Sequence, residues 1–118
     1  MSSQKPHYQL DVWKEAMLLV RQVYEVTRHF PQEEIYGLTA QVRRSAVSVP
    51  SNIAEGAARS SNKEFANFLS IARGSLSELE TQLLIAVDLG FFERDNKVFD
   101  KMERVSRLIT GLHKKLTK

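Results

Sequence analysis

Apolar residues between positions 38 and 56 recur in steps of three or four, the spacing that places side chains on one face of an α-helix. This face comprises Leu38, Val42, Ala46, Val49 and Ile53. A polar stripe lies beside it and comprises Gln41, Arg44, Ser45, Ser48, Asn52 and Glu55. Because the stripe borders the apolar face, we expect its side chains to lie between packed helices, where each polar group needs a hydrogen-bond partner.

Pro50 lies inside this pattern, and an interior proline removes one backbone hydrogen bond from a helix. The apolar spacing nevertheless continues across the proline without a change of phase, which favours a kinked but continuous helix. Ser48 and Ser51 are close enough to help satisfy the carbonyl of Ala46, which the proline leaves free, or to redirect the chain. The alternative is a helix that restarts after the proline, with Asn52 and Glu55 as its capping box.

Three further segments show helical spacing, and short polar stretches with glycine or proline at 31–37, 56–62 and 90–96 separate the four. The apolar seams of the third and fourth segments are Phe65, Leu69, Ala72, Leu76, Leu79, Leu83, Ala86 and Val98, Met102, Val105, Ile109, Leu112, Leu116. The candidate N-caps are Ser60, Ser61 and Asn62 for the third helix and Asp95 for the fourth. The pattern predicts an all-α, up-down-up-down four-helix bundle, with residues 1–118 as a single domain.

The first helix, predicted from about Asp11 to Phe30, has two apolar seams where a bundle core needs one. The seams are Leu10, Trp13, Met17, Val20, Tyr24, Thr27 and Val12, Ala16, Leu19, Val23, Val26, Phe30. Small residues also follow the far side of the second helix at Ala40, Val47, Ala54 and Ala58. These features indicate either a wide core face or a contact surface for another subunit.

The second and third helices form an antiparallel hairpin in this prediction, in which residue i faces roughly residue 120 minus i. Glu78 then lies within one turn of Arg44. We expect a buried ion pair between Glu78 and Arg44 or Arg43, and a close approach of the two backbones near Gly74. The full polar set comprises Gln41, Arg43, Arg44, Ser48, Asn52, Glu55, Ser75 and Glu78.

The charge of the chain is concentrated in its last segment. The basic residues of 97–118 are Lys97, Lys101, Arg104, Arg107, Lys114, Lys115 and Lys118. The acidic residues of the same segment are only Asp100 and Glu103. The segment is therefore more positive than the 118-residue chain as a whole, which has a formal charge of +3. Such a basic face is what contact with nucleic-acid phosphates requires. The structural alternative is a solvated helix face with cations near its C-terminal end.

Few residues point to catalysis or to a bound cofactor. The chain has no cysteine, its three histidines are far apart, and no glycine-rich phosphate loop occurs. We therefore expect no catalytic residues, no metal and no cofactor. No apolar run approaches the roughly 18 residues of a membrane span, including at the start of the chain. We expect a cytoplasmic protein without a membrane partner.

Several motifs resemble one family. They are Tyr8-x-Leu10-x-Val12-Trp13-Lys14, Phe30-Pro31, Tyr36-Gly-Leu38, Gln41-x-Arg43-Arg44, Ser48-x-Pro50-x-Asn52-Ile-Ala-Glu-Gly56, Phe68-Leu69-x-Ile71-Ala72, Gly74-Ser-Leu-x-Glu78-Leu-Glu80-Thr81-x-Leu83 and Leu89-Gly-Phe91. Together they resemble the bacterial four-helix-bundle proteins encoded in intervening sequences of large-subunit ribosomal RNA genes. Ser45 and Ala57-Ala58 depart mildly from the family pattern, which has alanine at the first position and often an aromatic residue at the second.

The resemblance implies a four-helix bundle that assembles into a homopentamer, without a catalytic role for the motif residues. A related branch, the accessory variability determinants of diversity-generating retroelements, is similar in fold and binds nucleic acid and a reverse transcriptase. Two functions are therefore expected as alternatives. The first is a homo-oligomeric accessory protein that binds RNA or DNA through its basic surface. The second is an oligomeric scaffold that binds another protein and no nucleic acid.

Overall fold

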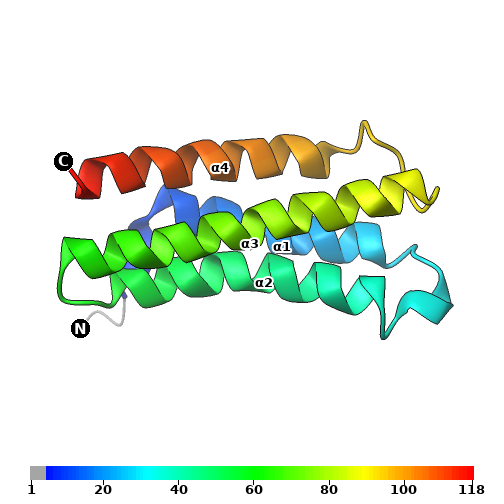
Figure 1. Ribbon diagram of the computed structural model, residues 1–118, viewed down its shortest axis with the longest axis horizontal. Helices are drawn as coiled ribbons and strands as arrows, with labels where there is room; N and C mark the ends of the chain where they lie inside the picture. Colours follow the sequence, from blue (N-terminus) through cyan, green and yellow to red (C-terminus); the bar gives the residue numbers. More distant parts are fainter. Residues whose placement is uncertain (1–4) are drawn as a thin grey trace.

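The computed structural model describes residues 5–118 as four α-helices packed together, with no β-strand in that range (Figure 1). The helices are α1 (Asp11–Thr27), α2 (Leu38–Ala57), α3 (Asn62–Asp88) and α4 (Lys97–Leu116), with short 3-10 helices η1 (Pro6–Gln9) and η2 (Gln32–Glu34). Successive helices run in opposite directions, as the sequence predicts. Residues 1–4, part of the stretch without an apolar run, lie outside the described residues.

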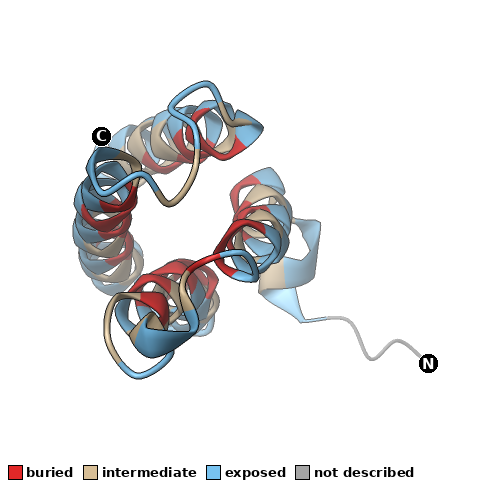
Figure 2. Cartoon of the chain, turned by 90° about the vertical axis from the view of Figure 1, so that its right-hand side faces the viewer, coloured by how far each residue is buried: buried red, intermediate tan, exposed pale blue. Residues whose placement is uncertain are grey.

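The four helices enclose one apolar core, and their buried residues face the centre of the bundle (Figure 2). Each helix contributes fully buried aliphatic side chains to it, including Leu19, Ile53, Leu69, Leu79, Leu83 and Ile109. The predicted seams of the second, third and fourth helices supply most of these residues. The hydrophobic effect therefore acts on the faces that the spacing of apolar residues identified.

The two seams of α1 have different environments. The seam that begins at Val12 is buried along its whole length. The other seam remains partly open, since Met17 and Tyr24 are exposed. The helix ends at Thr27 rather than at the predicted Phe30. The chain turns there, and Phe30 reaches the core from the following loop, with its ring 5.4 Å from that of Phe91.

Pro50 is buried inside a continuous α2, so the prediction of an unbroken helix is confirmed and a restart is wrong. The hydroxyl of Ser51 donates to the carbonyl of Val47 at 2.8 Å, and Ser48 pairs with Ser75. Within residues 5–118 neither serine therefore hydrogen-bonds to the carbonyl of Ala46, as one of the two predicted roles required. The side-chain amide of Asn52 donates back to the Ser48 carbonyl instead of capping a new helix.

The N-caps of α3 and α4 are residues of the expected types, but the cap of α4 lies one residue later than predicted. Ser61 caps α3 by accepting a hydrogen bond from the backbone N–H of Glu64 at 3.2 Å. Asn96 caps α4 by accepting one from the N–H of Val98 at 2.9 Å. The predicted cap Asp95 is wrong by one residue. Asparagine and aspartate both cap well, so local sequence could not distinguish the two positions.

The helices α2 and α3 are in tight contact at Gly56. A Cβ atom there would lie 2.7 Å from Cβ of Phe68 and 2.9 Å from Cδ1 of Phe65, too close for any other residue without movement. At Gly74 a Cβ would meet nothing within 4 Å, so the predicted close approach at Gly74 is wrong. Gly56 lies next to the connection between the helices, where their axes are held together by the short turn.

Candidate functional site

The predicted buried pair of Arg44 with Glu78 is wrong. Both side chains are exposed, and no ion pair joins them within residues 5–118. They instead border a hollow of about 240 Å³ between α2 and α3, here called the α2–α3 hollow, which is lined by Gln41, Arg44, Ser45, Ser48, Glu78 and Gln82. Small serines occupy the contact line between the helices, which leaves the longer charged side chains at the rim in contact with water.

Three predicted residues do come together beside this hollow. The hydroxyl oxygens of Ser48 and Ser75 are 2.8 Å apart, and the amide nitrogen of Asn52 donates to the Ser48 hydroxyl at 3.0 Å. In the predicted register Ser48 would face Ala72, so the true register differs by three residues. The three side chains form one hydrogen-bonded chain that connects α2 to α3.

Other members of the polar set lie on different faces. Nε of Arg43 donates to the hydroxyl of Thr27 at 2.8 Å, and its guanidinium carbon lies 4.6 Å from the centre of the Tyr24 ring. Arg43 therefore joins α2 to α1, and the alternative pairing of Arg43 with Glu78 is also wrong. Glu55 is exposed and pairs with Arg59 at 2.8 Å. Thr27 and Tyr24 belong to a predicted apolar seam, so the spacing of residues gave no signal of their contacts with Arg43.

Three cations of the basic segment are paired within the chain. Nζ of Lys101 lies 2.7 Å from Oε1 of Glu15 on α1, and Nε of Arg104 lies 3.2 Å from the same oxygen. Arg107 pairs with Glu103 one turn earlier, at 3.5 Å. The hydrogen bond from Lys101, with the charges of Lys101 and Arg104, lowers the pKa of Glu15 below its ordinary value, although burial acts in the opposite direction.

The other cations of the predicted set have no ion pair among the described residues: Lys97, Lys114, Lys115 and Lys118. The last three lie at the end of the bundle that also holds the α2–α3 turn, with Arg59 and Lys63 (Figure 1). The helix ends and connections at the opposite end are rich in acidic residues: Glu33, Glu34, Asp88, Glu93 and Asp95. Three of these four cations without an ion pair among the described residues thus lie at one end of the bundle.

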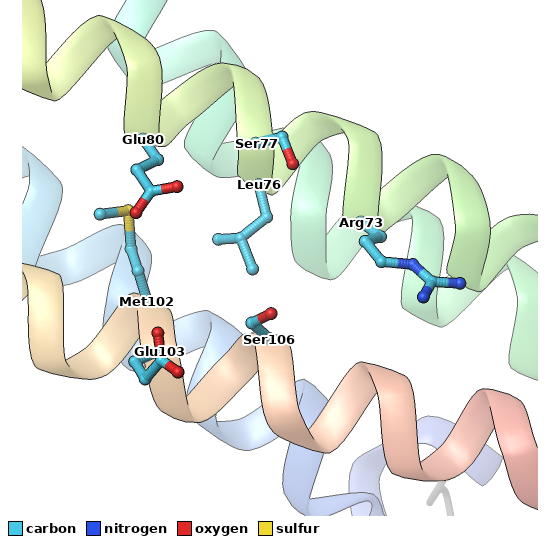
Figure 3. Close-up of a pocket in the computed structure, with 7 residues that line it drawn as sticks. All are labelled: Arg73, Leu76, Ser77, Glu80, Met102, Glu103 and Ser106. Carbon is cyan, nitrogen blue, oxygen red and sulfur yellow. The ribbon is translucent and has the colours of Figure 1, made fainter.

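A smaller hollow lies between α3 and α4 (Figure 3). Its volume is about 60 Å³, and its floor is formed by Leu76 and Met102. Glu80 and Glu103 point into it from the two helices, while Arg73 points away from them. Within the described chain no three histidine or acidic side chains are grouped closely enough to share a metal ion. The space suits ordered water molecules rather than a cofactor.

The family model described as 23S rRNA-intervening sequence protein matches residues 8–111. The chain belongs to this family. The match confirms the resemblance found in the motifs and includes the α2–α3 hollow, Gly56 and the ion pairs of Glu15. Lys114, Lys115 and Lys118 lie beyond the part of this 23S rRNA-intervening sequence protein that the model matches. Comparison with curated proteins gave no match.

None of the helices within residues 5–118 combines the length and apolar character needed to cross a lipid bilayer.

Proposed function

We propose that this 23S rRNA-intervening sequence protein is a non-enzymatic, cytoplasmic homo-oligomer that binds the phosphate backbone of RNA or DNA through one basic end of its bundle. A homopentamer is the assembly that the family resemblance implies. The basic end comprises Lys63, Lys114, Lys115 and Lys118, with Arg59 beside them. The observation that carries the proposal is this clustering, at one end of the molecule, of exposed lysines from α3 and α4 that have no ion pair among the described residues.

Exposed apolar side chains support self-association. Among the large exposed apolar residues, Met17, Leu18 and Tyr24 lie on α1, Val47 on α2, and Ile71, Leu84 and Ile85 on α3. In contrast, α4 exposes none of its large apolar residues. Apolar surface on three helices is what a subunit interface buries.

The mode of binding follows from the kind of side chains present. Lysines contact phosphates as point charges and carry no base-specific hydrogen-bond pattern, so binding is expected to tolerate any sequence. Each subunit supplies few free cations, so affinity should come from several subunits acting on one strand.

The oligomeric protein scaffold is the second candidate function. The internal pairing of Lys101, Arg104 and Arg107 favours it, because a cation held by a carboxylate of its own chain is less available to phosphates. The two candidates differ in one measurable property, the dependence of nucleic-acid retention on salt.

The experiment measures mass and binding in the same preparation. Light scattering should give about five times the 13.5 kDa of one chain, and retention of single-stranded RNA or duplex DNA should fall steeply with salt. A combined Lys114→Gln, Lys115→Gln, Lys118→Gln variant should keep its mass while the slope of log affinity against log salt decreases. Each lost contact should reduce that slope by roughly 0.7 to 0.9.

A matched control removes the same charge from the opposite end of the bundle, as Arg28→Gln, Arg94→Gln, Lys97→Gln. This control should keep the wild-type slope. An equal loss in both variants would mean that net charge rather than the basic end controls binding. Wild-type protein that fails to bind even at low salt would leave the scaffold as the function. Reversal of Lys101 or Arg104 is unsuitable as a test, since it would place a carboxylate against Glu15.

A further inference from the structure

The side-chain oxygen of Gln82 has no hydrogen-bond partner in the described part of the chain. Gln82 lines the α2–α3 hollow and is 8% exposed, so water reaches little of it. Ser45, in the wall of the same hollow, is 6% exposed and makes no hydrogen bond to this oxygen within residues 5–118. Buried carbonyl oxygens in folded proteins are nearly always paired. The hollow is therefore a place where a donor from outside the chain is needed.

Apolar residues extend beyond both ends of the hollow. Ile71 and Ile85 are 51% and 45% exposed and lie on the same stripe of α3 as Glu78, seven residues to either side. Fourteen residues of helix span roughly 21 Å at 1.5 Å per residue. A small molecule that fills about 240 Å³ could not cover both isoleucines. A partner that covers them must extend along the helix as another protein surface does.

The charges at the rim favour a second copy of the chain as this partner. Arg44 and Glu78 have no ion pair within residues 5–118, and their opposite charges cancel, so the rim does not attract a polyanion. A second copy carries both charges and can place each against its opposite. It also brings exposed apolar side chains, such as Met17 and Tyr24 of α1, to cover the isoleucines.

We propose that the α2–α3 hollow is a docking site for a second copy of this chain, whose N–H or O–H group donates a hydrogen bond to the side-chain oxygen of Gln82. This inference rests on the proposed self-association and identifies the surface on which it occurs. The hollow is incomplete in one subunit because the donor belongs to the other.

Gln82→Leu tests the inference, because subunit and assembly should respond in opposite directions. In the separated subunit, leucine removes an unpaired buried oxygen, so resistance to unfolding should be unchanged or greater. In the assembly it removes a hydrogen bond, so the dissociation constant should rise about tenfold or more in a sedimentation dilution series.

Gln22→Leu is the matched control. The side-chain oxygen of Gln22 is also buried and has no hydrogen-bond partner within residues 5–118, but it lies in a hollow between α1 and the start of α4, lined by Glu25, His29 and Asn96 among others. Its replacement should affect the stability of the subunit in the same way and leave the dissociation constant unchanged.

Labelling with a maleimide locates the interface independently, since the chain has no cysteine. An Ile85→Cys variant should react at least tenfold more slowly in the assembly than after dilution, whereas Lys114→Cys on α4 should react equally fast in both. The docking site would be overturned, with self-association left in place, by two results together. Ile85→Cys would react as fast in the assembly as after dilution, and Gln82→Leu would leave the dissociation constant unchanged. Such a result would assign the hollow to water or to a different protein. A wild-type chain that is monomeric at every concentration would overturn both proposals.

Discussion

The helices α2 and α4 are each 20 residues long and both run antiparallel to α3, yet their outer sides are very different. The outer side of α2 carries small and apolar residues such as Ala40 and Val47, next to a hollow with a buried oxygen that has no hydrogen-bond partner in residues 5–118. The outer side of α4 is dominated by charged residues. Each helix has an apolar face that places it in the bundle, but of the two only α2 presents an outer surface suited to burial by another subunit.

The contacts that α2 and α4 make with other helices inside the bundle also differ. At Gly56 the backbone of α2 lies against the phenylalanines of α3, so shape controls the fit. Between α4 and α1 the contact at Lys101 and Glu15 is electrostatic, with side chains that are 20% and 18% exposed. The stability contributed by the packing at Gly56 should therefore be sensitive to added side-chain volume. The stability contributed by the ion pair of Lys101 with Glu15 should be sensitive to pH.

Replacing Gly56 with alanine should have the largest effect on stability. The added Cβ would collide with Cβ of Phe68, which cannot move without its helix, and overpacking of this kind costs about 1–3 kcal/mol. Gly111→Ala on α4 is the control, because a Cβ there meets nothing within 4 Å and should stabilise the helix by up to about 1 kcal/mol. Denaturant unfolding measures both changes. A loss at Gly56 no greater than at Gly111 would contradict the close contact.

The ion pair between α1 and α4 should have an intermediate effect that depends on pH. Because the folded-state pKa of Glu15 lies below its ordinary value of 4.5, the pair should stabilise the fold fully above that value. Its contribution should disappear as the pH falls through the lowered pKa.

Glu15→Gln should lose about 1–2 kcal/mol at pH 7, near the lower end of the roughly 1.5–3 kcal/mol of a hydrogen bond to a charged group because the pair is partly exposed, and much less at low pH. Urea unfolding of both proteins between pH 7 and pH 3 measures the difference. A gap between wild type and variant that is constant with pH would show that Glu15 contributes through packing rather than through its charge. Glu103→Gln, which affects only an exposed pair on α4, is the control.

The smallest effect is expected on the outer side of α4. Lys114→Gln with Lys115→Gln should change the free energy of unfolding by less than about 0.5 kcal/mol, because both side chains are exposed and neither is in an ion pair of the described residues. Thermal unfolding measures this change. A larger loss would mean that these lysines contribute to the fold, and it would weaken their assignment to nucleic-acid contact.

Periodicity in the chain was enough to predict the four helices, their order and most of the core. The unbroken register across Pro50 even distinguished a continuous α2 from a restarted one. These features are local, since the position of an apolar residue within 3.6-residue turns decides which side of the helix it occupies. The family could also be recognised, because its motifs are short runs of neighbouring residues.

The partners of the long polar side chains depended on how the helices pack. Arg43 and Arg44 are adjacent in sequence, yet one bonds Thr27 on α1 and the other stays exposed beside the α2–α3 hollow. The pairing of Lys101 with Glu15 joins residues 86 positions apart and has no sequence signal. A shift of one residue moves a side chain by about 1.5 Å along the helix and turns it by about 100°. Small differences in register and in the distance between axes therefore select the polar contacts, while the apolar core tolerates them.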